Sequence, residues 1–451
     1  MTTHLHETTA RALHRIALGR QTKHRVPGLY AGVVRDGGFV WQEGIGAADV
    51  DEPDRAPGPD DQFLIASNSK TFTAVLVMQL RDEGKLRLDD TLGTLLPGTR
   101  HADVTVRQCL SHVSGLQREP VGDVWDTLVS PDRDALVRGL EDAERVGAPH
   151  RLWHYSNLVY ALLGEVVARI EGRPWFDVLQ DKVLRPLEMS RTSNGFDQGP
   201  RAVGYYVPPF SDVARVEPVW EVQALDACTG LASTPADLAR WNAFLADPPA
   251  AVLAPDTLAE MCEPQTLVDR ERWTAGFGLG FFLVRKGNRT FVGHTGAMPG
   301  HITGNFVHRE SGTGALVMMS STSSPDPAAF AVELADHVIE HDPVEPEVWR
   351  PGTAVPDELE GLLGVWYSEG SPFVFSVRKG RLEARLQGLP EHKPSSTFER
   401  VGEDVYRTTA GRETGELLRV TRTETGEVRS MHWATYLCTR EPLAFGEHLR
   451  D

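Results

Sequence analysis

The order of apolar and polar stretches predicts a first part of the chain with strands at both ends and helices between them. Residues 26–41 hold two apolar runs around the turn sequence Arg35-Asp36-Gly37-Gly38, which predicts two paired strands. Residues 69–84 repeat apolar positions at helical spacing and stop at a glycine, which predicts an amphipathic helix. A mostly helical region follows, with residues 106–116 and 157–172 as its clearest segments.

Extended patterns return before a closing helix. Residues 277–296 and 302–321 each contain two apolar runs separated by turn residues, so each stretch predicts a hairpin. Residues 327–340 carry the apolar spacing of a helix. We therefore expect residues 1–342 to form one α/β (α+β) domain, with an antiparallel sheet and a helical region.

The pattern changes after this domain. Residues 341–356 contain four prolines and no periodicity, and we place a linker at residues 343–357. From residue 363 to 447, short strands alternate with Gly, Lys, Glu and Asp turns. This predicts an antiparallel meander that closes into a small β-barrel over residues 358–451. Two domains also suit a chain of 451 residues, which is too long for one compact core.

Composition narrows the classes of partner. The chain has 41% hydrophobic and 24% charged residues, as in ordinary globular proteins. Its 46 basic and 63 acidic residues give a net charge of −17, which repels phosphate backbones and anionic lipid. We therefore expect neither nucleic acid nor a membrane as a partner. With no apolar run of signal-peptide or membrane-spanning length, the expected location is cytoplasmic, and a monomer is the default.

The sequence predicts no metal and no organic cofactor. Its four cysteines are far apart and form no C-x-x-C pair, so neither a zinc site nor a redox dithiol is indicated. They are most simply buried thiols. The chain also lacks a ligand cluster and a glycine-rich loop of the kind that cradles phosphate.

The first candidate for chemistry is the pair Ser67 and Lys70. Serine is a weak nucleophile and needs a base within hydrogen-bond reach. Lys70 follows Ser67 by about one helical turn, so the two side chains share a face. A lysine serves as a base only where burial or another cation lowers its pKa. The same S-x-x-K spacing occurs at Ser376 and Lys379, in a predicted strand and turn where the side chains would not meet, so the motif alone decides nothing.

Two further motifs accompany Ser67. Tyr155-Ser156-Asn157 places a phenol and an amide two residues apart, just before an apolar helix, so both can project into one cavity. His294-Thr295-Gly296 lies at the end of a predicted strand, where glycine permits close backbone approach to a ligand.

In this order, S-x-x-K, Y-x-N and H-T-G resemble the penicillin-recognising serine enzymes, the penicillin-binding protein and class C β-lactamase-like family. The family includes serine β-lactamases, D,D-peptidases, D-aminopeptidases, esterases and penicillin-binding-protein-type thioesterases. The segments IASNSKTFTA, VTVRQCLSHVSGL and GHTGAMPG are similar to its class C-like branch. The resemblance covers residues 26–340 and implies a β-lactamase/transpeptidase-like domain.

The resemblance implies roles for five residues. Ser67 would attack a carbonyl and become acylated, and Lys70 and Tyr155 would share the proton transfers. Asn157 would donate to a substrate amide or orient Lys70. The backbone N–H groups of Ser67 and Ala297 would form the oxyanion hole.

His294 of the third motif is counted with the catalytic residues, and Thr295, Gly296 and the distant Arg440 are expected to bind substrate. His294 stands where many relatives have lysine, and a histidine is charged only part of the time at neutral pH, which argues against an efficient β-lactamase. Thr295 and Gly296 would complete the binding strand, with the threonine hydroxyl facing a substrate carboxylate. Arg440, in the predicted last strand of the barrel, is a candidate to reach a substrate's C-terminal carboxylate across the domain interface.

Other residues near the motifs have open or structural interpretations. The irregular stretch 200–226, with Tyr205, Tyr206 and Trp220, either covers the cleft or is an ordinary surface excursion. We expect Trp153 to pack within its loop and His301 to be structural.

Three hypotheses for function remain. The barrel after the hydrolase domain and the histidine in H-T-G resemble the penicillin-binding-protein-type thioesterases. That resemblance implies transfer of a nonribosomal peptide from a peptidyl carrier protein thioester onto Ser67, then head-to-tail macrocyclisation, typically with a D-residue at the donor end. The alternative is a hydrolase, such as an esterase, D-aminopeptidase or D,D-carboxypeptidase, acting on a small ester or D-amino-acid peptide. A catalytically silent binding protein is disfavoured by the complete set of motifs.

Overall fold

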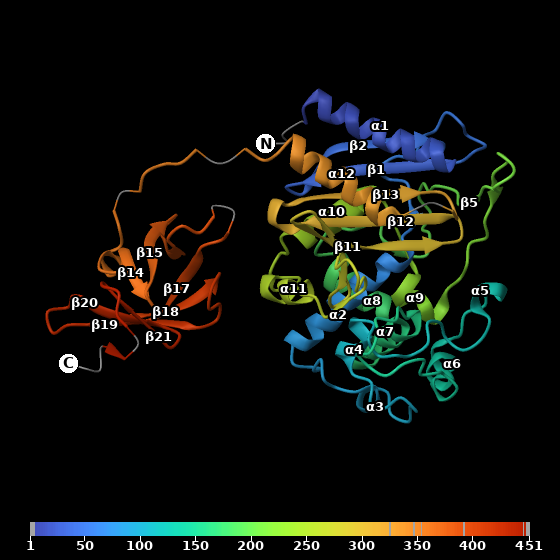
Figure 1. Ribbon diagram of the computed structural model, residues 1–451. Coiled ribbons are helices and arrows are strands. Elements are labelled where there is room, and N and C mark those ends of the chain that lie inside the picture. Colours follow the sequence, from blue (N-terminus) through green and yellow to red (C-terminus); the bar gives the residue numbers. More distant parts are fainter. Residues whose placement is uncertain are drawn as a thin grey trace. The chain divides into compact units, whose positions relative to one another are not determined.

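The computed structural model describes residues 5–323, 326–345, 348–352, 354–390, 393–444 and 446–447. The chain divides into two compact units, Met1–Glu345 and Pro346–Asp451, and each unit has its own hydrophobic core (Figure 1). The described residues between helix α12 (Pro327–His341) and helix α13 (Asp357–Glu360) belong to no helix or strand.

The first unit is organised around an eight-stranded antiparallel sheet in the order β2-β1-β13-β12-β11-β10-β9-β8. The predicted hairpins at residues 26–41, 277–296 and 302–321 are confirmed. The strands are β1 (Gly28–Arg35), β2 (Gly38–Gly46), β8 (Thr266–Leu267), β9 (Ala275–Phe277), β10 (Phe282–Lys286), β11 (Arg289–Met298), β12 (His301–His308) and β13 (Thr313–Met319).

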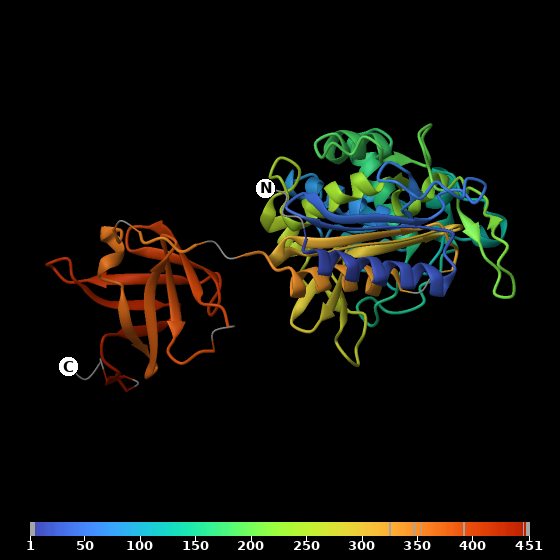
Figure 2. The same ribbon diagram turned by 90° about the horizontal axis from the view of Figure 1, so that it is seen from above.

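Helices cover both faces of this sheet. Helices α1 (Glu7–His24) and α12 lie side by side on one face, where Leu13 and Phe330 join the apolar side chains of β1 and β13 (Figure 2). All residues of β1 are buried because the opposite face is covered as well, by α10 (Pro235–Ala246) and the helical region. The sequence interpretation included α12 but not α1.

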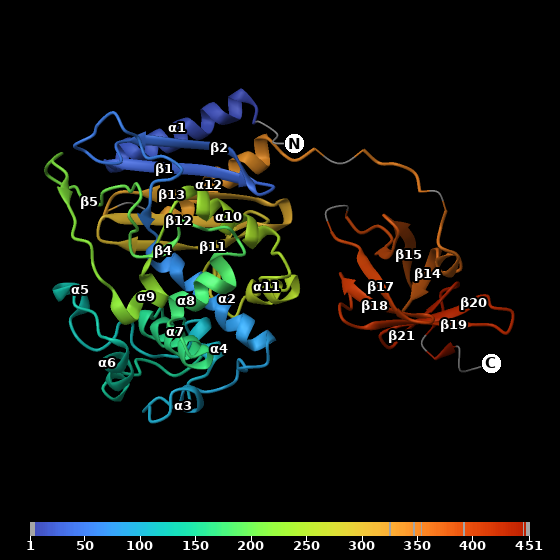
Figure 3. The same ribbon diagram turned by 180° about the vertical axis from the view of Figure 1, so that it is seen from behind.

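The helical region lies on one side of the sheet, below it in Figure 3. Helix α2 (Ser69–Asp82), predicted as amphipathic, is buried from Ser69 to Leu80 because α7 (Asn157–Glu171), α8 (Trp175–Leu179) and α9 (Asp226–Thr229) pack against it. A 3₁₀ turn, η1 (Ala66–Asn68), leads into α2. None of the helices in the described ranges has the length and apolar character needed to cross a bilayer.

Shorter elements complete the unit. The helical ones are α3 (Leu92–Leu95), α4 (Val106–Leu110), α5 (Val124–Thr127), α6 (Arg133–Arg138), η2 (Gly139–Glu141), the π turn η3 (Gln180–Leu184), η4 (Gln223–Leu225), α11 (Pro255–Met261) and η5 (Arg309–Ser311). Strands β3 (Phe63–Leu64), β4 (Ser193–Asn194) and β7 (Leu231–Ser233) form a small sheet, and β5 (Tyr205–Tyr206) pairs with β6 (Arg215–Val216).

The second unit is a closed antiparallel barrel of eight strands, which confirms the predicted fold. Its strands are β14 (Gly364–Ser368), β15 (Ser371–Arg378), β16 (Arg381–Leu386), β17 (Ser396–Gly402), β18 (Val405–Ala410), β19 (Leu417–Arg422), β20 (Val428–Trp433) and β21 (Tyr436–Thr439). Buried aromatic rings fill the interior, with Trp433 in contact with Phe373, Phe375 and Phe398. The second S-x-x-K lies on β15 and the turn after it, as the sequence predicted.

Candidate active site

The turn that carries Ser67 is held in a rare conformation. Ala66, directly before the serine, is fully buried and has a φ of 47°, in the left-handed region that costs a non-glycine residue free energy. Strain of this kind persists only where the surroundings over-determine the backbone, and it is frequent at functional sites. The structure thus presents Ser67 in the middle of η1, directly before α2, and about one turn before Lys70 as the spacing predicted.

The structure brings Ser67 and Lys70 together. Lys70 Nζ donates to Ser67 Oγ at 3.1 Å and to the carbonyl oxygen of Cys228 at 2.8 Å. The lysine side chain is completely buried, and its ammonium lies 5.0 Å from the centre of the Tyr155 ring and 5.8 Å from that of Tyr160. The Cys228 carbonyl, on α9, therefore aims the amine at the serine.

His112 holds the backbone on both sides of Tyr155, at His154 and at Ser156. The His112 carbonyl accepts from the N–H of His154 at 2.8 Å, and His112 Nδ1 accepts from the N–H of Ser156 at 3.1 Å. The imidazole also packs on the Tyr155 ring, with centroids 4.4 Å apart. Burial, then the nearby Lys70 charge, holds the His112 pKa well below its usual value, so this ring is a neutral support.

Asn157 begins α7 and points into the same cavity. Its Nδ2 donates to Glu119 Oε1 at 2.8 Å, while its Oδ1 is buried and has no partner among the described residues. The hydrogen bonds of Lys70 described above go to Ser67 and Cys228 and not to Asn157, so the orienting role has no support here. Donation from Asn157 to a substrate amide stays a prediction, while Oδ1 is open to a substrate N–H. Glu119 also pairs with Arg118, whose Nε lies 3.4 Å from Glu119 Oε1.

His294 is a neutral hydrogen-bond acceptor. Its Nδ1 lies 2.6 Å from the carbonyl oxygen of Thr295, and a carbonyl can only accept, so the proton is on Nδ1. Burial, then the Lys70 charge, lowers the His294 pKa to about 3. Its Nε2 is therefore a bare lone pair, buried and without a partner in the described parts of the chain. This histidine carries no charge with which to attract a substrate carboxylate.

A close contact inside the protein requires glycine at position 296, and the approach of a ligand there stays a prediction. A Cβ at this position would lie 2.1 Å from the carbonyl oxygen of Ile65, in the segment that enters η1. The missing side chain lets β11 pack against the catalytic turn. Thr295 and the exposed Ala297 line the pocket together with Ser67, and the oxyanion-hole role of Ala297 stays a prediction.

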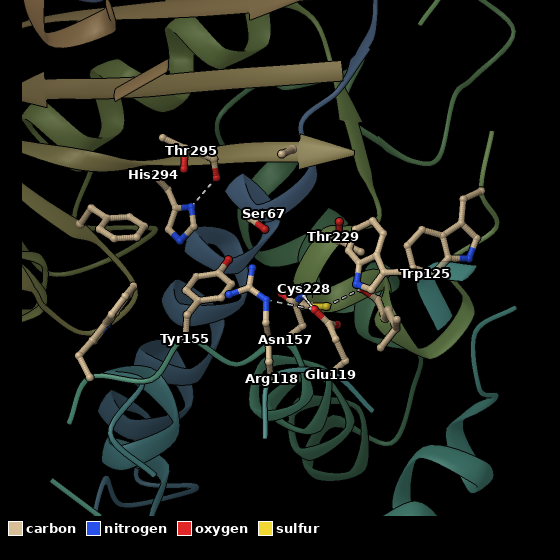
Figure 4. A pocket seen from close by; sticks show the side chains of 15 residues that line it. Ser67, Arg118, Glu119, Trp125, Tyr155, Asn157, Cys228, Thr229, His294 and Thr295 are labelled. Atoms are coloured by element: carbon tan, nitrogen blue, oxygen red, sulfur yellow. Dashed lines mark hydrogen bonds and ion pairs between the residues drawn. The ribbon is translucent and has the colours of Figure 1, made fainter. Parts of the chain in front are cut away.

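These elements enclose a cavity of about 360 Å³ (Figure 4). Ser67 and His294 lie above it in this view, Tyr155, Asn157 and Glu119 below, and Trp125 to one side. The lining residues are Ser67, Arg118, Glu119, Trp125, Trp153, Tyr155, Asn157, Trp220, Leu225, Cys228, Thr229, Phe282, His294, Thr295 and Ala297.

The sequence interpretation missed several of these contributors. Arg118 and Glu119 come one residue after the segment VTVRQCLSHVSGL, and that nearness was the available signal. Trp153, expected to pack only within its loop, lines the cavity. In the stretch 200–226, Trp220 reaches the pocket and supports the covering interpretation, whereas the Tyr205 hydroxyl donates to Asp49.

Two other residues singled out in the sequence are not among those that line this cavity. His301 is buried, with its ring against Phe63 and Phe196, in agreement with a structural role. Arg440 directly follows β21, where its guanidinium donates to the carbonyl oxygens of Gly361, Leu363 and Val365 and lies 3.8 Å from the centre of the Trp366 ring. These contacts give Arg440 a role inside the barrel unit, and its contact with a substrate carboxylate stays a prediction.

Comparison with known proteins follows the division into two units. A family model described as Beta-lactamase matches residues 13–339, and one described as a domain of unknown function (DUF7586) matches residues 355–440. The chain is 26% identical over 236 residues to Protein flp of Staphylococcus aureus (strain MW2), covering 50% of this chain and 47% of that protein. The chain thus spans about half the length of the curated relatives it matches.

Solved structures match both the first unit and the whole chain. The octameric penicillin-binding protein homologue from Pyrococcus abyssi superimposes with a TM-score of 0.67 and 20% identity, over 95% of this chain and 99% of that one. A D-stereospecific amidohydrolase from Streptomyces sp. matches with a TM-score of 0.61 and 25% identity, over 72% of this chain and 98% of that one. The first of these likenesses concerns the fold alone.

Proposed function

This chain belongs to the beta-lactamase family, and from that premise we propose that its serine hydrolase chemistry proceeds through an acyl-enzyme on Ser67 and serves substrates that present an amine to the pocket. The Ser67–Lys70 contact of 3.1 Å supports the first half of this proposal. The observation that carries the second half is the set of hydrogen-bond acceptors in the cavity.

Three acceptors from different segments line one pocket. Glu119 contributes a carboxylate, Asn157 a free Oδ1 and His294 a free Nε2. An ammonium group has three donors and no acceptor, so it satisfies such a site. A carboxylate would meet the lone pairs of Asn157 and His294, and Arg118, the basic side chain among the described lining residues, already pairs with Glu119. The lining therefore favours an amine over the free carboxylate of a cell-wall peptide or β-lactam.

The proposed acylation step balances as follows. Ser67 Oγ attacks a substrate carbonyl, forming a C–O bond, and its proton passes through Lys70 and Tyr155 to the leaving nitrogen, oxygen or sulfur as the old bond breaks. Donors from the backbone N–H groups of Ser67 and Ala297 would stabilise the oxyanion, a contribution worth about 2.7–4 kcal/mol for one donor in a comparable hole. Water or an amine then attacks the ester and regenerates Ser67.

The nucleophile of the second step separates two candidate functions. Hydrolysis of D-amino-acid amides or short D-peptides is favoured by the 25% identity to the D-stereospecific amidohydrolase, which this chain covers over 98% of its length. Macrocyclisation of a peptide delivered by a carrier protein is favoured by the barrel unit and by the acceptors, because an amine held beside the ester gains a large effective concentration. We place hydrolysis first.

One experiment tests the amine requirement and the second step together. The enzyme is incubated with D-phenylalanine amide, its N-acetylated form, and a linear peptidyl thioester that ends in a D-residue, and products are identified by mass spectrometry. We expect Glu119→Gln to lower kcat/KM about 10-fold to 100-fold for the free amine, the range of one charge-assisted hydrogen bond, and to leave the acetylated substrate unchanged. Equal use of both amides by the wild type would refute the proposal. Cyclic peptide would move macrocyclisation to first place, and linear product alone would remove it.

A further inference from the structure

Two tryptophans of the lining form an aromatic corner: Trp125 lies on the side of the cavity away from His294 (Figure 4), and Trp220 packs against it. Trp125 comes from α5, and Trp220 comes from the segment just before η4. Their ring centres lie 5.0 Å apart with the planes at 64°, an edge-to-face pair. Such a pair leaves the face of one ring and the edge of the other open to a third ring.

The exposure of the two indoles differs in a way that suits a binding wall. Trp220 is buried, with 6% of its surface exposed, and its Nε1 has no acceptor among the described residues. Packing, and not a hydrogen bond, therefore holds it in place. Trp125 keeps 45% of its surface exposed although it is a large apolar residue at a cavity rim. Leu225, which is buried, continues the apolar wall.

We propose that Trp125, Trp220 and Leu225 form a subsite for a planar aromatic side chain on the residue whose carbonyl Ser67 attacks. This inference rests on the proposed function and names its substrate class. It assigns one wall to each substituent of a single α-carbon: Ser67 meets the carbonyl, Glu119 meets the amine, and the tryptophan corner meets the side chain. Three such contacts on one carbon also distinguish its two mirror forms.

The polar and apolar walls make this assignment specific. An aromatic ring placed beside Glu119 and Asn157 would remove water from their acceptor atoms without replacing its hydrogen bonds, which costs free energy. The tryptophan corner, in turn, offers an ammonium only a ring face, without the negative charge that Glu119 provides. An aromatic side chain that leaves water for this corner gains about 10-fold to 100-fold in affinity over a methyl group.

Binding is measured as protection of Ser67 from a small fluorophosphonate probe, so the result does not depend on turnover. D-phenylalanine amide and D-alanine amide compete with the probe, and labelling is followed by intact mass. We expect the phenylalanine amide to protect at about 10-fold to 100-fold lower concentration in the wild type. In Trp125→Ala and Trp220→Leu this ratio falls at least about 10-fold, while D-alanine amide protects as before. Trp349→Ala is the control, because this exposed tryptophan belongs to the second unit and does not line the cavity, and it should keep the wild-type ratio.

The outcomes separate the two proposals. Equal protection by both amides in the wild type, or an unchanged ratio in Trp125→Ala, would overturn the aromatic subsite while the amine site stands. Loss of protection on N-acetylation of both amides supports the amine site independently of the tryptophans. Normal probe labelling of each variant shows that it is folded, so a lowered ratio then supports the subsite.

Discussion

Gly296→Ala tests whether close packing of β11 on the turn that carries Ser67 is needed for catalysis. The new methyl group would lie 2.1 Å from the Ile65 carbonyl oxygen and 2.7 Å from Thr303 Oγ1. Ile65 immediately precedes η1, so any displacement of its carbonyl is passed to Ser67. Because Thr303 Oγ1 also contacts Ile65 O, at 3.3 Å, rotation of one side chain does not relieve the clash.

The displacement gives the size of the effect. Contacts of a Cβ stay above 3.0 Å, so the strand and the turn must separate by at least about 0.9 Å (3.0 − 2.1). A misplacement of about 1 Å in a reacting pair costs on the order of 10²-fold in rate. We therefore expect acylation to slow about 100-fold in Gly296→Ala, with an overpacking cost of about 1–3 kcal/mol in the free energy of unfolding.

Acylation is measured as the burst rate with a chromogenic ester, and stability by urea unfolding. Gly38→Ala is the matched control: Gly38 begins β2 in the same sheet, and a Cβ there meets nothing within 4 Å. The control should acylate at the wild-type rate. If folded Gly296→Ala acylated within about threefold of wild type, close packing of β11 on the turn would not be what positions Ser67.

Three further changes have defined outcomes. Ser67→Ala should abolish fluorophosphonate labelling, read by intact mass, and any retained label would contradict the assignment of the nucleophile. His112→Phe keeps a ring against Tyr155 but removes the Nδ1 acceptor, so kcat should fall about 10-fold with KM unchanged. His112→Asn, which restores an acceptor, should recover part of the lost kcat. Equal kcat in the two variants would contradict the positioning role of His112. Burial raises the Asp226 pKa to about 6 from 3.8, so the protonated form is favoured in the folded state and stability is lost as pH rises through 6. Asp226→Asn should then be more stable than wild type at pH 8, by at most about 3 kcal/mol (a pKa difference of 2.2 at 1.36 kcal/mol per pKa unit), and should show no such gain at pH 4. Urea unfolding at pH 8 and pH 4 measures the two differences in stability. An equal change at the two pH values would contradict the prediction.

The parts of the fold that were predicted are those whose signals are local. Turn sequences such as Arg35-Asp36-Gly37-Gly38 specify which strands pair, and the short runs after residue 363 predict a meander whose closure follows from its size. Helix α1 was missed because it buries little apolar surface, chiefly Leu13 and Ala17. Helix α2 looked amphipathic, although tertiary packing buries its polar residues as well.

In the site, too, contacts between residues close in sequence were predictable, and those that depend on distant segments or on burial were not. Helical spacing alone places Lys70 near Ser67, so that contact was predictable. The Cys228 carbonyl that completes the lysine's environment comes from a segment about 160 residues away, and a backbone carbonyl leaves no mark in a sequence. The charge of His294 was not predictable either, because it depends on burial and on a hydrogen bond to the next residue's carbonyl.

The pairing of β1 with β13 has a consequence for synthesis on the ribosome. Leu29 lies opposite Met319, so 290 residues (319 − 29) separate the two partners of a central pair in the sheet. At about 5–20 residues per second, β1 waits on the order of 15–60 s for its neighbour to emerge. Ser67 likewise precedes Ala297, its predicted oxyanion partner, by most of that interval. A nascent chain therefore carries Ser67 long before a substrate can acylate that serine. On this assignment, reactivity begins only when β13 has paired with β1 and the sheet is complete.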